Sequence, residues 1–326
     1  MSLNHSIFPN CQNELLVLEQ QQEDIPWFTE ESVYEILLSA KKPRSSVSGD
    51  LPRKVLIEFL PELATPITHL WNKILVTCQY PDAWKQETTV VIPKTSPPSS
   101  KDDLSNIGLT PFLSKAFEKV LVKWLWDYVK SNWDSGQFGS RPGSSCTHYI
   151  IYLVDFVLKN WEKEKTSVLS LLLDWNKGFN RILHSRLITI LSDLGVPPFL
   201  LRIIFLFLSN RKMIVRHNGV FSEEKDLNGG GPQGSLLIVI LFCLYTNESG
   251  ILRPSHNPST LSNHEPLIGM APMENGSTIR VKYVDDLSVG EAISMIQQVE
   301  QIPQKHSYCN TYRERTGHGP IKKDCP

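Results

Sequence analysis

The sequence predicts an α+β fold, in which several helices pack behind a small antiparallel sheet. Apolar residues recur at helical spacing over several long stretches, and a few short β-branched runs stand between turn residues. Strands and helices do not alternate regularly, which argues against a doubly wound parallel sheet. With 326 residues, 41% of them hydrophobic, the chain can build a sizeable core in one large domain or about two domains.

Helical spacing predicts most of the secondary structure. Residue Thr29, followed by acidic residues, is expected to cap the first helix, and "RKVLIEFLPELATPITHLWNKILVTCQYP" is typical of a helical hairpin interrupted by Pro61 and Pro66. The two most apolar runs are too short to span a bilayer, so we expect buried helices there and no membrane contact. The predicted helices cover 28–42, 115–133, 146–163, 184–194, 198–209 and 236–245.

Strands are predicted at 88–93 and 167–174, and two hairpins are predicted further along the sequence. The first hairpin covers 212–227 with Asn218-Gly219 at its turn, a dipeptide that favours two-residue hairpin loops. The second covers 278–289 as strand, tight turn and strand. A glycine-rich loop at 228–235 precedes the last predicted helix.

Composition narrows the class of protein. The formal net charge is −1, so any site for a polyanion must come from local arrangement and not from bulk charge. The six cysteines are scattered without CxxC pairs, and the N-terminus lacks the layout of a signal peptide. We therefore expect an intracellular protein of the nucleus or cytoplasm that is not secreted.

Three aspartates are the candidate catalytic residues and metal ligands. Asp174 ends an apolar strand, and Asp285 and Asp286 lie at the turn of the last hairpin. If these strands are neighbours, the carboxylates converge at one sheet edge, where they suit two Mg²⁺ ions roughly 4 Å apart. The alternative is that Asp285 and Asp286 are ordinary turn residues.

Two further motifs offer contacts to a nucleotide. The glycines of "GGGPQGSLL" let the backbone approach a ligand, and Gln233 with Gly234 could contact a templating base or an incoming sugar. Phe179 follows Asp174 closely and could lie under a nucleotide sugar. The alternatives are a tight turn before a helix for the first motif and a core phenylalanine for the second.

In this order, "LLLDWNKGFNRI", "GGGPQGSLL" and "KYVDD" resemble the three palm motifs of reverse transcriptases, most closely those of non-LTR (LINE-type) retrotransposons. "PDAWKQETTVVIPK" and "DDLSNIGLTPFLSKAFEKVL" look like the family's finger motifs. "GQFGSRPGSSCTHYIIYLVD" is similar to the segment before the first palm strand. Several motifs in the correct order make coincidence a poor explanation.

The resemblance implies a right-hand polymerase with fingers and palm that copies an RNA template from a DNA primer with deoxynucleoside triphosphates. Asp174, Asp285 and Asp286 would hold two Mg²⁺ ions, with Mn²⁺ as an alternative metal. The remaining substrate-binding residues that it implies are Lys94 at the triphosphate, Arg141 at template or nucleotide, the Trp175 carbonyl, Phe179 as sugar gate, Gln233 and Gly234 at template and nucleotide, and Tyr283 beside the primer terminus.

The chain departs from the family pattern in places. Ser105 stands where the family normally has an arginine that reaches the triphosphate, and Gly178 stands where alanine is usual. Only 40 residues follow Asp286, so we expect the thumb to be largely absent. The second hypothesis is therefore a catalytically inactive, truncated retroelement relic or a repurposed nucleic-acid-binding module.

The expected domains follow from these motifs. They are a poorly ordered leader at 1–27, an N-terminal helical extension at 28–80, the fingers and palm at 81–301, and a poorly ordered tail at 302–326.

Overall fold

The structure is a computed structural model that describes residues 25–41, 47, 49–100, 103–163, 166–175, 178–247, 278–284 and 286–294. The chain forms two compact units. The first unit comprises Met1–Val129 and Ile182–Ile238, and the second comprises Lys130–Arg181 and Val239–Pro326. Each unit is thus assembled from two separate stretches of sequence.

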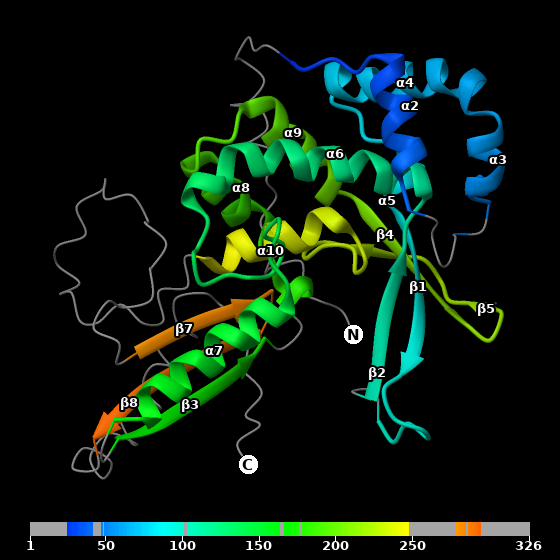
Figure 1. Cartoon of the computed structure of the whole chain (residues 1–326). Helices are drawn as coiled ribbons and strands as arrows, with labels where there is room; N and C mark the ends of the chain where they lie inside the picture. The colour runs from blue at the N-terminus through cyan, green and yellow to red at the C-terminus, as the bar shows by residue number, and fades with distance from the viewer. Residues whose placement is uncertain are drawn as a thin grey trace. The chain divides into compact units, whose positions relative to one another are not determined.

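Helices dominate the first unit (Figure 1). The first of them begins where the sequence predicts, because Thr29 and Ser32 exchange side-chain and backbone hydrogen bonds in a capping box. It ends at Ser39, short of the predicted end at residue 42. The helices of this unit are α2 (Glu30–Ser39), α3 (Arg53–Glu58), α4 (Leu60–Thr77), α5 (Asp82–Lys85), α6 (Phe112–Val129), α8 (His184–Asp193) and α9 (Pro198–Leu208).

Helix α4 corrects one prediction. Pro61 lies in its first turn, where a missing N–H is tolerated, but Pro66 lies inside the helix and does not interrupt it. The break falls instead at Phe59, between α3 and α4. The buried residues Trp71 and Leu75 lie on this helix, so tertiary packing outweighs the local penalty of the proline.

An aromatic cluster joins the helices of the first unit. The ring of Trp71 lies 5.1 Å from that of Phe28 and 5.5 Å from that of Phe117 on α6. Tyr80 packs against Trp84 at 5.6 Å and against Phe207 of α9 at 5.8 Å. Residues near the N-terminus therefore share one core with α6 and α9.

A mixed sheet completes the first unit. The strand order is β2-β1-β4-β5, with β6 paired to β4, and β1 runs parallel to β4 while the other pairs are antiparallel. The predicted strand at 88–93 and the hairpin around Asn218 are confirmed, but β2 was not predicted. The strands are β1 (Gln86–Pro93), β2 (Leu104–Leu109), β4 (Arg211–His217), β5 (Val220–Phe221) and β6 (Lys225–Leu227).

The second unit contains the predicted antiparallel sheet, with strand order β3-β8-β7. Helix α7 packs along this sheet, as Figure 1 shows, and Ser145 caps its N-terminus by accepting a hydrogen bond from the His148 N–H. The remaining elements are η3 (Lys130–Asn132), α7 (Cys146–Trp161), β3 (Thr166–Asp174), η4 (Gly178–Arg181), β7 (Thr278–Tyr283) and β8 (Asp286–Ser294), together with α10 (Leu236–Asn247), whose first turn belongs to the first unit.

The described residues thus form an α+β fold, as predicted, with one correction. A second, mixed sheet accompanies the small antiparallel one. Among the described helices, none is both long and apolar enough to span a bilayer.

Candidate active site

The strand register of the second unit brings two of the three predicted catalytic aspartates together. Asp174, the last residue of β3, lies directly opposite Asp286, the first residue of β8. On the other side of β8, Tyr283 is the residue opposite Asp286. The two backbones at positions 174 and 286 therefore meet at one end of the sheet, as the sequence predicted. Asp285 lies outside the described residues.

The donor chemistry at this sheet end suits a hard cation. Carboxylate oxygens are the ligands that Mg²⁺ takes in proteins, usually one or two together with substrate phosphate oxygens. Among the side chains that the structure describes, no three His, Cys, Asp or Glu residues lie close enough to share a metal ion. Asp285 and the Asp174 side chain are not in that set, so the three-aspartate site stays a prediction.

The turn between β7 and β8 has an unusual backbone. The strands end at Tyr283 and resume at Asp286, so the loop has two residues, and Val284 adopts φ 58°. Two-residue hairpin loops favour positive φ at their first residue, which glycine or asparagine normally supplies. A β-branched residue there is an outlier, and such conformations cost about 1–3 kcal/mol and persist only when neighbours hold them.

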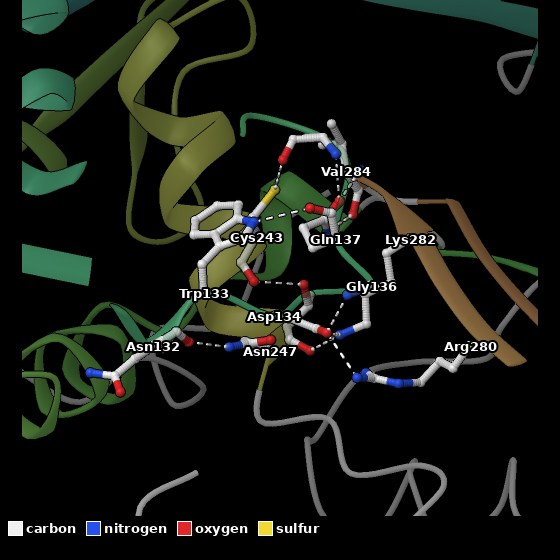
Figure 2. A network of polar contacts seen from close by, with 12 residues as sticks. Asn132, Trp133, Asp134, Gly136, Gln137, Cys243, Asn247, Arg280, Lys282 and Val284 are labelled. Atoms are coloured by element: carbon white, nitrogen blue, oxygen red, sulfur yellow. Dashed lines mark hydrogen bonds and ion pairs between the residues drawn. The ribbon is translucent and has the colours of Figure 1, made fainter. Parts of the chain in front are cut away.

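Gln137 provides such a hold, and sequence reasoning did not single it out. Its Oε1 accepts a hydrogen bond from the Val284 N–H at 3.0 Å, and its Nε2 donates to the Val284 carbonyl at 3.3 Å (Figure 2). The residue stands in the "GQFGSRPG" segment that carried part of the family resemblance. The sequence carries no signal for this role, because the burial of Gln137 and its contacts with Val284 are visible only in the fold.

A buried ion-pair network lies beneath the same strand. Asp134 forms ion pairs with Arg280 at 2.9 Å and Lys282 at 3.1 Å (Figure 2). Lys282 also donates a hydrogen bond to the Thr246 carbonyl at 3.1 Å. Burial, and then the charge of Arg280, lower the pKa of Lys282 to about 8. Lys282 therefore remains protonated at neutral pH, and the network fixes β7 just before the candidate catalytic turn.

Tyr283 belongs to an aromatic group beside this turn. Its ring lies 6.1 Å from that of Tyr149 on α7, and the Tyr149 hydroxyl is hydrogen-bonded to Ser288 of β8. Phe138 packs at 6.5 Å from Tyr149. Helix α7 therefore supports the hairpin that carries Tyr283 and Asp286.

The aromatic residues after Asp174 gather around Phe242 of α10. The Phe179 ring lies 4.7 Å from that of Phe242, and the Trp175 ring lies 6.3 Å from it. A Cβ at Gly178 would come within 2.7 Å of the Phe242 ring. The Phe179 ring packs against Phe242, as expected of a core phenylalanine. The residue is also half-buried, so part of it is exposed, as a residue that contacts a nucleotide sugar would be.

In the first unit, the glycine-rich loop packs closely on β2. A Cβ at Gly108 would lie 2.3 Å from the Gln233 carbonyl, and a Cβ at Gly234 would lie 2.7 Å from the Gly108 carbonyl. Gly234 has φ 101°, a conformation that side chains disfavour. His184 donates to the Gly230 carbonyl at 2.6 Å, and burial lowers the pKa of its imidazole. Gln233 and Gly234 are thus held as a defined turn.

Glu118 of α6 fixes the start of the helix that follows this loop. Its carboxylate accepts hydrogen bonds from the Ser235 hydroxyl and from the backbone N–H of Leu236 at 3.0 Å and Leu237 at 3.4 Å. A negative charge at a helix N-terminus is favourable, and Arg211 is a nearby buried cation. The sequence had not predicted this buried cap.

Lys94 and Ser105 lie at the same end of the β1–β2 ladder. Ser105 pairs with Ile92, and the Lys94 N–H donates to the Asp103 carbonyl at 2.7 Å. Cross-strand pairing places the side chains of Ile92 and Ser105 on one face of this ribbon, and Lys94 is the first residue after β1. Lys94 is exposed, so it is accessible to an anion.

The predicted site residues thus fall into two groups, one in each unit. The first unit holds Lys94, Gln233 and Gly234, whereas the second holds Arg141, Asp174, Trp175, Phe179, Tyr283 and Asp286. Arg141 is exposed in the turn before α7. Its predicted role at template or nucleotide stays a prediction.

Asp174 and Asp286 thus lie opposite each other at the end of a small antiparallel sheet, beside a two-residue turn. This arrangement is typical of proteins that bind a divalent cation through carboxylates at a sheet edge. The comparisons with known proteins make the class specific. A family model described as "Reverse transcriptase (RNA-dependent DNA polymerase)" matches residues 92–305, about two-thirds of the chain. The chain therefore belongs to the reverse transcriptase family.

Its relatives are polymerases of mobile elements. The chain is 29% identical over 237 residues to the RNA-directed DNA polymerase from mobile element jockey of Drosophila melanogaster. The aligned region covers 71% of this chain and 25% of the relative. The corresponding protein of Drosophila funebris is 27% identical over 282 residues, covering 85% of this chain and 29% of the relative. The chain thus spans about a quarter of the length of these relatives, and the resemblance to non-LTR retrotransposons is confirmed.

Proposed function

We propose that this chain is an RNA-directed DNA polymerase domain that adds deoxynucleotides to a DNA primer on an RNA template. The observation that carries the proposal is the register of β3 and β8, which sets Asp174 opposite Asp286 beside the two-residue turn. In this proposal the β3-β8-β7 sheet is the palm and the β1–β2 ribbon belongs to the fingers. Residues 28–80 are a helical extension, and the protein acts inside the cell.

Asp174, Asp285 and Asp286 would hold Mg²⁺, or Mn²⁺ as an alternative. When bound, the ions would activate the primer 3′-hydroxyl and offset charge on the triphosphate. The chain's own residues orient the substrates. Their roles are proposed as Lys94 at the triphosphate, Trp175 through its carbonyl, Phe179 beneath the sugar, Gln233 and Gly234 at template and nucleotide, Arg141 at template or nucleotide, and Tyr283 beside the primer end.

Primer extension by the purified chain, with an RNA template, a DNA primer and Mg²⁺, tests the proposal. We expect Asp286→Asn to lower extension by at least about a hundredfold, because a neutral amide is a poor ligand for Mg²⁺. Asp155→Asn is the matched control, since Asp155 is exposed on α7 of the same unit and pairs only with Lys159 in the described contacts. Equal activity of Asp286→Asn and Asp155→Asn would contradict the metal site.

The second candidate is a catalytically inactive relic that still binds nucleic acid, and Ser105 is the observation that favours it. Serine cannot supply the bidentate cationic fork of an arginine beside Lys94. Extension and template binding are therefore measured together, for the chain and for Ser105→Arg. Template binding without extension, and without gain from Ser105→Arg, would favour the relic. Extension that rises with Ser105→Arg would favour the polymerase.

A further inference from the structure

The segment Gly136–Gly139 runs beside β7 as an extra, short strand. Lys282 N–H donates to the Gly136 carbonyl at 2.7 Å, and Phe138 N–H donates to the Lys282 carbonyl at 2.9 Å. Gln137 and Lys282 form a parallel bridge. This pairing brings Gln137 alongside the end of the strand that leads into the "YVDD" turn.

The Gln137 side chain extends this pairing beyond the end of β7. Its Oε1 accepts hydrogen bonds from two backbone N–H groups, those of Val284 at 3.0 Å and Gly139 at 2.9 Å. Its Nε2 donates to the Val284 carbonyl at 3.3 Å. One amide therefore satisfies both backbone groups of the turn residue, as a neighbouring strand would (Figure 2).

Gln137 is itself held in place. Only 2% of the residue is exposed, and its carbonyl accepts a hydrogen bond from the Trp133 indole at 3.0 Å (Figure 2). Gly139 leaves the room for this arrangement, because a Cβ there would lie 2.4 Å from the Val284 nitrogen. The amide thus meets the turn from a fixed support and not from a flexible side chain.

We infer that Gln137 is a positioning residue that holds Val284 at positive φ and thereby helps to place Asp286, the first residue of β8 after the turn. Val284 is the first residue of the two-residue loop that joins β7 to β8, so its backbone conformation influences the path of the chain towards Asp286. A valine does not adopt φ 58° readily by itself, and Gln137 supplies the contacts that select this conformation. The catalytic part of this inference rests on the proposed polymerase function.

The first test needs no polymerase activity. Hydrogen exchange is followed at the Val284 and Gly139 amides in the chain and in Gln137→Leu, which keeps a similar volume but removes the amide. We expect exchange at both amides to rise by about tenfold or more, because their shared acceptor is lost. Unchanged exchange at Val284 would overturn the inference.

A matched variant controls for the loss of a buried amide. Asn160 on α7 is also 2% exposed and lies in the same unit, where it donates to the Phe156 carbonyl and accepts from Lys163. Asn160→Leu is therefore expected to lower stability without changing exchange at Val284. If Asn160→Leu raises exchange at Val284 as much as Gln137→Leu does, the effect is general loosening and the inference fails.

The second test uses primer extension under conditions where the chain is active. Gln137→Leu should lower kcat by about tenfold to a hundredfold with little change in KM for the nucleotide, because misplaced carboxylates affect the chemical step. Gln137→Glu keeps an acceptor for the two N–H groups but cannot donate to the Val284 carbonyl, so its loss should be intermediate. Raised exchange at Val284 with an unchanged kcat would overturn the positioning role.

The two proposals fail in different ways. If the unaltered chain extends no primer, the polymerase proposal fails, and hydrogen exchange alone decides whether Gln137 holds the turn. If the chain is active and Gln137→Leu changes neither exchange nor kcat, the polymerase proposal stands and the inference about Gln137 fails.

Discussion

Gly178 illustrates how a single residue sets the packing next to a candidate catalytic strand. A Cβ at this position would meet two Phe242 ring carbons at 2.7 and 2.8 Å and the Trp175 Cβ at 3.1 Å. The family resemblance marked Gly178 as a departure from the usual alanine, and the structure supplies a physical reason. The large Phe242 ring occupies the space that a methyl group would need, so glycine and phenylalanine are matched.

This match makes a prediction about stability. Gly178→Ala should lower the free energy of unfolding by about 1–3 kcal/mol, because it overpacks a buried site. Phe242→Leu alone should also destabilise, since it loses the contact with Phe179, but the double variant should lose less than the sum of the two. Denaturant unfolding of the three variants measures this coupling. Strictly additive losses would show that residues 178 and 242 do not compete for space.

At the scale of elements, α6 and the first turn of α10 are joined through hydrogen bonds to a buried carboxyl group and not only through apolar contact. Glu118 accepts hydrogen bonds from the first turn of α10 and contacts Ser114, which in turn is hydrogen-bonded to the Tyr80 hydroxyl. The turn before α10 carries Gln233 and Gly234. The cap at Glu118 therefore determines where the helix starts and where the loop ends.

Burial gives this cap a pH dependence. Burial raises the pKa of the Glu118 carboxyl above its ordinary value of 4.5, and the hydrogen bonds from Ser235 and the backbone only partly oppose it. Because the pKa of Glu118 is higher in the folded than in the unfolded protein, its protonated carboxyl group adds to the free energy of unfolding. This contribution is fully present below pH 4.5 and is lost as the pH rises through the folded-state pKa. The ionised carboxylate is thus the less favourable form in the folded protein.

Glu118→Gln should remove this loss. Glutamine can still accept from Ser235 and Leu236, and its amide can donate to Ser114, but it cannot ionise. The free energy of unfolding of the variant, relative to that of the unaltered chain, should therefore increase as the pH rises from 4.5. Urea unfolding of both proteins from pH 4.5 to 8 measures the difference. Glu87, whose pKa burial also raises, is present in both proteins, so a constant difference across this range would contradict the assignment to Glu118.

Local sequence patterns predicted most elements because their causes are local. Thr29 and Asn218-Gly219 act within a few residues, and this cap and this turn lie where the sequence predicted them. Strand β2 was missed because "LSNIGL" lacks a β-branched run and exists through pairing with β1. The predicted helix break at Pro66 was wrong, because the burial of α4 outweighs the local penalty of the proline and cannot be inferred from the proline itself.

The candidate site divides in the same way. The sequence predicted that Asp174 and Asp286 would converge if their strands were neighbours, and the register shows that these strands are neighbours. Gln137 and Glu118 were not predicted, because each acts on a backbone more than a hundred residues away in the sequence. A polar residue that serves a distant backbone has no local pattern to mark it.

At the scale of the whole molecule, each compact unit combines two distant stretches of chain. The N-terminal helices belong to the first unit, where Trp71 is fully buried and packs against Phe117 of α6. The proposed helical extension at 28–80 thus shares a core with residues of the proposed polymerase domain. We therefore expect that packing within residues 28–80 stabilises α6 as well as the N-terminal helices.

Two tryptophans of the N-terminal segment test this expectation. Trp71→Ala should cost about 3–5 kcal/mol, because Trp71 is 0% exposed and its removal leaves a cavity against Phe28 and Phe117. Trp27→Ala is the control, since Trp27 is 66% exposed and its loss should change stability by less than about 0.5 kcal/mol. Hydrogen exchange along α6 reports how far the damage spreads. If Trp71→Ala increased exchange only within α2–α4 and left α6 protected, the N-terminal helices would be an independent extension and the shared core would carry no folding energy.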